Sequence, residues 1–390
     1  MKRWVSAVLL VAAACGGGGG TARRTSAPET DASDKGHELY LDGKLDLAER
    51  ELATQVARDP KNSLARRVLG RVLLLKGRNR ESSEQFLSYV TLTRKEEVPV
   101  DGSAIQDLFW ALYRMDDYAN AAKAAAMLDD SVFAVKYGEM ARRGSPYTAE
   151  WREPPSVMAL EGANFASLRI NRMPGRFALD LGAGEMVLDR AFAKQAGVRR
   201  VGVPNPGVEK DEQGIVETVD LPNLQVRNVP VVVGQVRGGA DGVLGVGFLS
   251  HMQSTVDFRR GRAVLRPAGS PVREGETWPL LFAGDRTLLT PARIDGIDTF
   301  VIVNPTARGV KFVPSQAMLI EKARKSPKSP ALERLEIGSL SMAIETQAPD
   351  QFPSGVDVAY GFIIGGMVGA DAFRNRTVTF DFRAMKITIE

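Results

Sequence analysis

The sequence has few of the side chains with which enzymes usually build metal sites or nucleophilic relays. It contains one cysteine, Cys15, and two histidines, His37 and His251. With one thiol the chain can form no internal disulfide, so packing alone must stabilise the fold. No His/Cys/Asp cluster has metal-ligand spacing, and no phosphate-binding or dinucleotide-binding glycine motif is present. The sequence therefore predicts a protein without a metal or another cofactor.

A strong charge of either sign is also absent, as is a membrane-spanning apolar run. The 51 basic and 47 acidic residues give a net charge of +4. This charge is too small to indicate an electrostatic footprint for nucleic acid, so we expect no nucleic-acid partner. The apolar run at residues 4–14 is too short to cross a bilayer, which takes about 20 residues.

Residues 1–14 have the composition of an export signal. Lys2 and Arg3 precede the apolar run, and three alanines lead to Cys15 and a run of glycines. This ending resembles a bacterial lipoprotein signal, in which the cysteine is lipidated and becomes the new N-terminus; an ordinary cleaved signal is the alternative. The resemblance implies a periplasm-facing envelope protein, expected at the outer membrane, that touches the membrane through its lipid alone. Residues 15–36 would be its flexible tether.

Residues 37–150 show apolar side chains at helical spacing and almost no strand pattern. A Gly-Lys pair at 43–44 recurs 34 residues later as Gly-Arg at 77–78, and a looser third copy spans 108–128. A helix-turn-helix unit of this length resembles tetratricopeptide repeats, which usually bind peptides or partner proteins. A plain helical bundle remains the alternative.

The rest of the chain reads as short strands separated by turn residues, and it contains an internal duplication. A constant offset of 124 residues relates the two copies. The matching pairs are Asp180 and Asn304, Ala183 and Ala307, Gly245 and Gly369, and Asp257 and Asp381. A chance match would not hold one offset over anchors nearly eighty residues apart, so we expect two lobes, at 157–267 and 284–390.

Each copy has a strand, an Asp-Ser/Thr-Gly-like turn, a second strand, a hairpin, an apolar-apolar-Gly loop and a final hairpin. This order resembles a retropepsin lobe, and the tandem resembles a two-lobed aspartic protease of the pepsin type. The resemblance implies an all-β, two-lobed domain behind the helices. It also implies a turn containing Gly182 and Ala183, support of each turn by Gly245 or Gly369, and a flap at 203–217.

The two matching turns differ where aspartic proteases need a pair of acids. Such enzymes place two carboxylates about 3 Å apart, and the two share one proton. Here lobe 1 supplies Asp180 as the candidate catalytic residue, whereas lobe 2 supplies Asn304, which cannot ionise. Leu181 stands where the family has a hydroxyl that links the turns. Pro305 and Thr306 depart from the pattern in the second turn.

Three functions are therefore open. The chain is an envelope lipoprotein that binds extended peptides or proteins between its lobes, with weak or no hydrolysis. Alternatively, it is an active aspartic endopeptidase whose dyad forms in trans from Asp180 of two molecules. As a second alternative, it is an assembly adaptor that acts through the helical repeats. The two histidines give no support to a Ser-His-Asp triad, and Asp257 and Asp381 read as structural turn residues.

Overall fold

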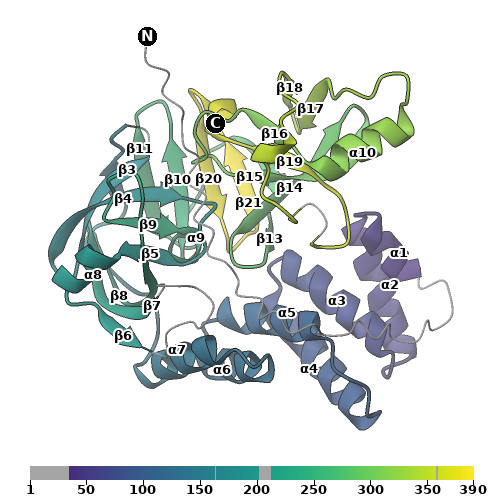
Figure 1. The fold of residues 1–390 in the computed structure, drawn as a ribbon, viewed down its shortest axis with the longest axis horizontal. Helices are drawn as coiled ribbons and strands as arrows, with labels where there is room; N and C mark the ends of the chain where they lie inside the picture. Colours follow the sequence, from purple (N-terminus) through teal and green to yellow (C-terminus); the bar gives the residue numbers. More distant parts are fainter. Residues whose placement is uncertain (1–34, 163, 202–211, 357–358) are drawn as a thin grey trace.

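The computed structural model describes residues 35–390 except 163, 202–211 and 357–358 (Figure 1). Cys15, the expected tether up to residue 34, and residues 203–211 of the expected flap lie outside the described residues. The described chain comprises a helical domain followed by an all-β domain of two lobes. In Figure 1 the lobes lie side by side, with the helices along one side of both.

Helices form the described chain from residue 35 to residue 142. Their bounds are α1 (Lys35–Leu41), α2 (Leu45–Arg58), α3 (Ser63–Leu75), α4 (Asn79–Lys95), α5 (Gly102–Tyr113), α6 (Tyr118–Met127) and α7 (Ser131–Arg142). Polar side chains fix several helix starts by accepting hydrogen bonds from free backbone N–H groups. Asn62 caps α3, Asp101 caps α5 and Asp130 caps α7 in this way.

The turns inside successive helix pairs share one backbone conformation. Gly43 between α1 and α2 and Gly77 between α3 and α4 both have φ of +72°, and Asp116 between α5 and α6 has φ of +59°. Positive φ is uncommon for residues other than glycine, so its recurrence at these three turns indicates that the helix pairs are built alike. The helices thus form successive hairpins, of which the first two are 34 residues apart as in the sequence pattern, while Asp116 follows Gly77 by 39 residues. Their assignment to tetratricopeptide repeats stays a prediction.

Lobe 1 is built on a sheet in the order β1-β8-β5-β9-β4-β3-β7-β6. Its strands are β1 (Thr148–Trp151), β3 (Phe165–Ile170), β4 (Met173–Asp180), β5 (Met186–Asp189), β6 (Arg199–Val201), β7 (Glu212–Leu221), β8 (Leu224–Gly234) and β9 (Gly242–Gly245), and its helices are α8 (Arg190–Gln195) and α9 (Val246–Leu249). The long β7–β8 hairpin has no equally long counterpart in lobe 2.

Lobe 2 is built on a sheet in the order β16-β19-β15-β14-β17-β18, with β13 paired to β14. Its strands are β13 (Leu281–Ala283), β14 (Thr287–Ile294), β15 (Ile297–Val303), β16 (Phe312–Pro314), β17 (Arg334–Ile337), β18 (Leu340–Ala343) and β19 (Ile364–Val368). Helix α10 (Gln316–Lys325) and the 3₁₀ turns η1 (Pro349–Gln351) and η2 (Ala370–Phe373) complete it.

The two lobes share strand register as well as element order. In lobe 1, β3 and β4 pair from Phe165 with Ala178 to Ile170 with Met173. In lobe 2, β14 and β15 pair from Leu289 with Ile302 to Ile294 with Ile297. Each of these residues in lobe 2 lies 124 positions after its counterpart in lobe 1, so the sequence offset corresponds to one repeated structural unit.

A third sheet joins the lobes and has a symmetric order, β12-β21-β20-β10-β11-β2. Its strands are β2 (Ser156–Ala159), β10 (Met252–Asp257), β11 (Arg262–Pro267), β12 (Glu276–Pro279), β20 (Thr377–Asp381) and β21 (Lys386–Ile389). At its centre β10 pairs with β20, and Thr255 stands opposite Thr379, its own counterpart at the offset of 124. Their hydroxyl oxygens are 3.0 Å apart. A pseudo-two-fold axis therefore passes between these two threonines.

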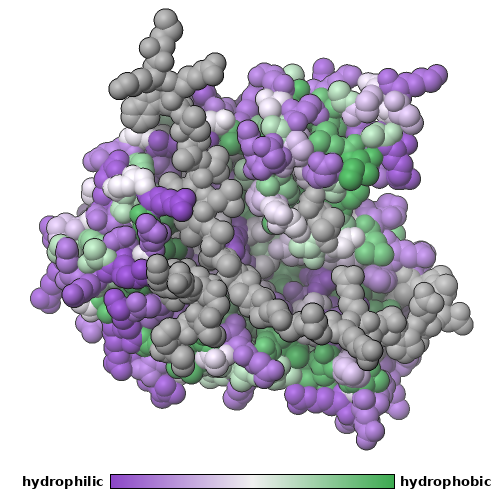
Figure 2. All heavy atoms as spheres, in the orientation of Figure 1, coloured by the Kyte–Doolittle hydropathy of each residue, from purple (hydrophilic) through white to green (hydrophobic). Residues whose placement is uncertain are grey.

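The hydrophobic core continues from the helices into both lobes. Tyr40, Leu69 and Leu73 belong to one cluster with Phe300 and Phe362 of lobe 2. Helices α4–α7 share a second cluster with lobe 1 and the joining sheet. Figure 2 shows a mainly hydrophilic surface in this view, with apolar groups reaching it over the helices and over lobe 2. The exposed large apolar side chains among the described residues are Leu41, Leu47, Leu87, Val98, Val135, Val157 and Ile320.

Buried polar contacts also fasten the helices to the lobes. Lys136 of α7 is fully buried and forms an ion pair with Glu185, which follows the first turn of lobe 1. The Lys136 ammonium also donates to Gln213 Oε1 at 2.7 Å, and the Tyr137 hydroxyl donates to Glu185 Oε1 at 2.7 Å. Burial lowers the pKa of Lys136, and the Glu185 carboxylate opposes that shift. The helical domain thus holds both the residue after the turn and the base of the β7–β8 hairpin.

Lys136→Met should destabilise the protein by about 3 kcal/mol, because it leaves the largely buried Glu185 without its cation. Adding Glu185→Gln to Lys136→Met should recover part of the loss, since the unpaired charge is then removed. Thermal unfolding of the full chain measures both effects. Lys325→Met is the control, because Lys325 makes an exposed ion pair on α10 and should change stability by less than about 1 kcal/mol. Equal effects of Lys136→Met and Lys325→Met would contradict a structural role for the buried pair.

Candidate functional site at the lobe junction

The candidate acid stands where a central strand of lobe 1 ends. Asp180 is the last residue of β4, which runs parallel to β9 and places Asp180 beside Gly245. In lobe 2, β15 runs parallel to β19, and Asn304 follows its last residue. Because the two strands end at equivalent points on either side of the pseudo-two-fold axis, their turns meet at the junction between the lobes.

Gly245 and Gly369 lie directly beneath these turns. A Cβ on Gly369 would lie 2.5 Å from the carbonyl oxygen of Val310, and one on Gly245 would come even closer to that of Gly184. The backbone next to each glycine holds its turn. Val246 N–H donates to Ala183 O at 2.8 Å, and the matching Ala370 N–H donates to Ala307 O at 2.7 Å. No residue with a side chain fits at Gly245 or Gly369 without a backbone shift.

The structure brings Asp180 and Asn304 together. Gly182 N–H donates to Asp180 Oδ1 at 2.8 Å, and the equivalent Thr306 N–H donates to Asn304 Oδ1 at 3.1 Å. The side chain of Asn304 hydrogen-bonds to Asp180. A Cβ on Gly182 would lie 2.5 Å from Asn304 Nδ2, so only glycine leaves room for this amide. Each side chain is therefore held by its own turn and by the opposite one.

Thr306 makes the link between the turns, a role that the sequence did not reveal. Its hydroxyl lies 2.6 Å from Asn304 Oδ1 and 3.3 Å from Asp180 Oδ1, and it accepts a hydrogen bond from Leu181 N–H at 2.9 Å. Leu181 itself is buried and contributes no polar group. The linking hydroxyl thus comes from lobe 2, one position later in the turn than the family pattern has it. The one sequence signal for this role is that threonine replaces the glycine of the Asp-Ser/Thr-Gly pattern in the second turn.

Burial and one nearby cation set the protonation of Asp180. Burial raises the pKa of Asp180, while hydrogen bonds from Gly182, Asn304 and Thr306 and the charge of Arg286 act against that rise. Arg286 lies in the turn between β13 and β14 and pairs with its neighbour Asp285 at 3.2 Å. Sequence reasoning missed Arg286, because nothing near it in the chain marks it as a neighbour of Asp180.

The charged loop at 284–286 is itself held by the helical domain. The guanidinium of Arg114, at the end of α5, donates to Phe282 O at 2.8 Å, to Leu74 O at 3.2 Å and to Gly284 O. Burial lowers the pKa of Arg114 to about 10. Helices α3 and α5 thus position the loop that carries Arg286 towards Asp180.

The arrangement contains one group at its centre that can hold a proton. A carboxyl and an amide can share a hydrogen bond, but the amide cannot take the charge or proton that the second acid of a dyad exchanges. Asp180 can act as a hydrogen-bond acceptor when ionised and as a donor when protonated. The junction therefore presents one carboxyl and one amide as hydrogen-bonding groups, and the second turn has an amide where the first has an acid.

The remaining residues that the sequence singled out lie elsewhere and have structural partners. His251 follows α9, stacks on Tyr147 with ring centroids 3.8 Å apart, and reaches Asp116 through Nε2 at 3.1 Å. Asp257 accepts hydrogen bonds from Arg260 N–H and from the Arg262 side chain within its hairpin. Asp381 accepts in the same way from two backbone N–H groups of its own turn.

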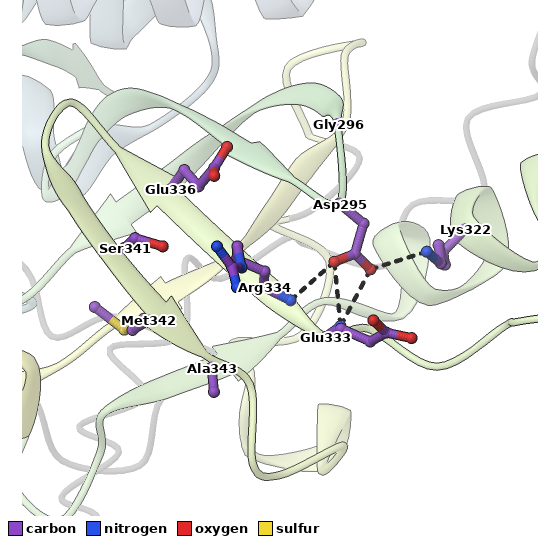
Figure 3. Close-up of a pocket in the computed structure, with 9 residues that line it drawn as sticks. All are labelled: Asp295, Gly296, Lys322, Glu333, Arg334, Glu336, Ser341, Met342 and Ala343. Atoms are coloured by element: carbon purple, nitrogen blue, oxygen red, sulfur yellow. Dashed lines mark hydrogen bonds and ion pairs between the residues drawn. The ribbon is translucent and has the colours of Figure 1, made fainter.

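A cavity of about 510 Å³ lies in lobe 2 away from this junction (Figure 3). Its lining includes Asp295, Lys322 and Arg334, and the Lys322 ammonium pairs with the Asp295 carboxylate at 3.0 Å. Asp295 also accepts hydrogen bonds from the backbone N–H groups of Glu333 and Arg334. As Figure 3 shows, these contacts converge on Asp295 and tie the β14–β15 turn to neighbouring segments.

Neither a metal cluster nor a membrane span is found in the part of the chain that the structure describes. Within residues 35–390, apart from the short undescribed segments, no group of three or more His, Cys, Asp or Glu side chains could hold a metal ion. A separate search of the same residues finds no helix both long and apolar enough to cross a bilayer.

One family model and several solved structures match this chain. The family model of the gag-polyprotein putative aspartyl protease matches residues 166–251, which lie within lobe 1. The crystal structure of a retropepsin-like aspartic protease from Rickettsia conorii matches with 15% identity and a TM-score of 0.24, over 31% of this chain and 94% of that one. Basic 7S globulin from soybean matches with 11% identity and a TM-score of 0.37, over 63% of this chain and 95% of its own.

No curated protein matches the sequence significantly. The family match within lobe 1, together with the repetition of that lobe in the second half, supports a retropepsin-like, aspartic-protease-like fold for the β domain.

Gly245→Ala should prevent folding or destabilise the protein by at least ~3 kcal/mol, because the new Cβ would collide with backbone carbonyls of the first turn. Soluble yield and thermal unfolding measure the effect. Gly138→Ala is the matched control, since a Cβ there meets ordinary contacts in α7 and should be neutral or stabilise by up to about 1 kcal/mol. A stable Gly245→Ala protein would show that the close approach beneath the turn is not needed.

Asp180→Asn should raise the melting temperature at pH 7, by roughly 2 °C or more. Since burial raises the pKa of Asp180, the folded state binds more protons than the unfolded state between the ordinary value and the raised one. Stability then falls as pH rises through that window, and the ionised carboxylate destabilises the fold at neutral pH. The gain should shrink at about pH 3, where the carboxyl is protonated in both states. Asp298→Asn, at an exposed site, is the control. A loss of stability at pH 7 would mean that the ionised form is the favoured one.

Proposed function

We propose that this chain is an exported, lipid-anchored envelope protein whose retropepsin-like domain binds extended peptide segments between its lobes and hydrolyses them weakly or not at all. The lipid anchor at Cys15 and the periplasm-facing location follow from the sequence pattern of residues 1–20. The binding function follows from the lobe junction. We propose a peptide or protein as the ligand, and the membrane as a contact of the anchor only.

One observation carries the proposal: the carboxyl of Asp180 faces the amide of Asn304. In aspartic proteases one carboxyl accepts a proton from the attacking water while its partner protonates the scissile carbonyl. The amide of Asn304 can do neither, and it already donates to Asp180. The turn nonetheless keeps its glycine support and its link between the lobes, which favours a retained binding site over a discarded one.

The fold also supports the mode of binding. Extended peptides commonly bind by adding a strand to exposed backbone groups, while pockets receive alternate side chains. Strand β6 of lobe 1 ends just before the segment that the sequence assigned to the flap, and β7 contains residues 212–217 of that segment. A peptide bound at the junction would lie across both turns, because Asp180 and Asn304 are in contact with each other there.

A dyad formed in trans by two molecules has less support. Strand β10 of the joining sheet pairs with β20 of the same chain from Ser254 to Asp257, and Asn304 and Thr306 contact Asp180 at the junction. A second lobe 1 could reach Asp180 only after this sheet opened. Covalent linkage favours the intramolecular pairing through its high effective concentration.

The adaptor function, acting through free helical repeats, also has less support. Helices α1–α3 share a core with lobe 2, and α4–α7 share one with lobe 1. The exposed apolar side chains of the helical domain stand on separate elements, such as Leu47 on α2, Leu87 on α4 and Val135 on α7. The helical domain is better described as the support of the two lobes.

Asn304→Asp should create acid peptidase activity, because it restores the second carboxyl beside Asp180. Incubation with a pool of random decapeptides at pH 4 should show cleavage at least ~100-fold faster than by the wild-type protein, as expected for gain of a general acid–base partner. Binding of the same pool by the wild-type protein is measured by fluorescence anisotropy. Asn304→Asp with Thr306→Gly is a second variant, in case the threonine blocks the active geometry.

The double variant Asp180→Asn/Asn304→Asp is the matched control, since it keeps one acid and one amide in exchanged positions and should cleave no faster than the wild type. Fast wild-type cleavage that Asp180→Asn abolishes would instead establish the active endopeptidase. If the wild type and all variants neither bound nor cleaved the peptides, that result would contradict the proposed function.

A further inference from the structure

The two sides of the junction carry different charged residues although their backbones match. On one side, Gly184 of the first turn lies against Asp285, and Arg286 follows in the same loop; a Cβ on Gly184 would lie 2.5 Å from Asp285 Oδ2. At the offset of 124, Arg308 takes the place of Gly184, and Gly162 takes the place of Arg286. The arginine has thus moved from the loop of one lobe to the turn of the other. We refer to this second side as the Arg308 flank.

Arg308 shares an aromatic surface with a second arginine. Its guanidinium carbon lies 5.7 Å from the centroid of the Phe165 ring, and that of Arg176 lies 3.8 Å from the same centroid. Gly162 lies next to this guanidinium, since a Cβ there would be 3.9 Å from Arg308 Nη2, an ordinary contact distance. Stacking on an aromatic ring orients a guanidinium and leaves its N–H groups available to an anion.

The carboxylates near this flank have partners other than Arg308. Arg176 lies 3.6 Å from Glu161, and its Nη1 reaches Gly239 O at 3.4 Å; Asp241 accepts from the backbone N–H of Arg176. Arg308, which is exposed, has no carboxylate partner among the described residues. Partial burial and the charge of Arg176 lower the pKa of Arg308, which agrees with two cations held close together. On the opposite side, Arg286 forms an ion pair with Asp285, with Nε and Oδ1 3.2 Å apart.

We propose that the Arg308 flank is a carboxylate-binding subsite, in which Arg308 receives an acidic side chain or the C-terminal carboxylate of a peptide bound across the lobe junction. This inference rests on the proposed function. A planar guanidinium binds a carboxylate through two parallel N–H···O bonds, and such charge-assisted bonds are stronger and more directional than neutral ones. The anion would also relieve the repulsion between Arg308 and Arg176. Arg308 lies four residues after Asn304 in the chain. The subsite would therefore favour peptides that carry a negative charge next to the segment bound at Asp180 and Asn304.

The test uses the full chain and four pools of fluorescent peptides. Two pools are amidated nonapeptides of random sequence with either glutamate or glutamine fixed at the centre. The other two are random octapeptides with either a free or an amidated C-terminus. The wild-type protein should bind one carboxylate pool about tenfold more tightly than its neutral partner, as expected for one charge-assisted ion pair. The pair of pools that shows this preference distinguishes a side chain from a chain end.

Arg308→Gln should remove the preference, while Arg293→Gln, at an exposed arginine of the β14–β15 hairpin, should retain it. Arg308→Glu should disfavour the carboxylate pool, and added salt should weaken the wild-type preference. Equal wild-type binding of charged and neutral pools would overturn the subsite while leaving the proposed function intact. A preference that survives Arg308→Gln would also overturn it. If the wild-type protein bound none of the four pools, that result would contradict both the subsite and the proposed function.

Discussion

The pairing of β10 with β20 is the constraint on which the rest of the structure depends. It places Thr255 opposite Thr379, so the two lobes are related by a pseudo-two-fold axis at the centre of one continuous sheet. Once this sheet has formed, the strands that carry Asp180 and precede Asn304 must approach the axis from both sides. The contact between an acid and an amide is therefore a consequence of how the lobes are joined, and no local feature of either turn could produce it alone.

The two halves share the backbone that forms the junction, while several of the side chains that face it differ. Thr306 supplies the hydroxyl that Leu181 lacks, and Arg308 stands where lobe 1 has Gly184. The glycines beneath the turns are kept in both halves because the backbone leaves no room for a side chain. Positions that preserve the architecture are the same in the two lobes, whereas positions that decide chemistry have diverged, as expected when function resides in sites placed on a fold.

The sequence predicted the architecture better than the site. The constant offset of 124 predicted two equivalent lobes, and the turn pattern predicted that Asp180 and Asn304 would be counterparts. The offset could not show that the hydroxyl of Thr306 bridges the turns, because that contact spans 125 residues to Leu181 and depends on the approach of the lobes. Arg286 and the buried pair of Lys136 and Glu185 are long-range contacts of the same kind. Helical spacing predicted helices at 37–150, but it could not indicate which of their faces pack on the lobes.

The helical domain takes part in the site through such contacts. Arg114 holds the loop that presents Arg286, and Lys136 and Tyr137 hold Glu185 just beyond the first turn. The two lobes and the helices consequently share their cores and their buried charges. A change in the helices would therefore reach the junction through the loop and the turn that they hold.

The most direct test of the account is a titration of the Asp180 carboxyl by carbon NMR in the full chain, with Asp180→Asn used to assign its signal. The account predicts one titration step at a pH above the ordinary aspartate value of about 3.9, since one buried acid faces an amide. Two coupled steps would reveal a second acid sharing its proton, and a single step at or below the ordinary value would contradict the buried pairing with Asn304.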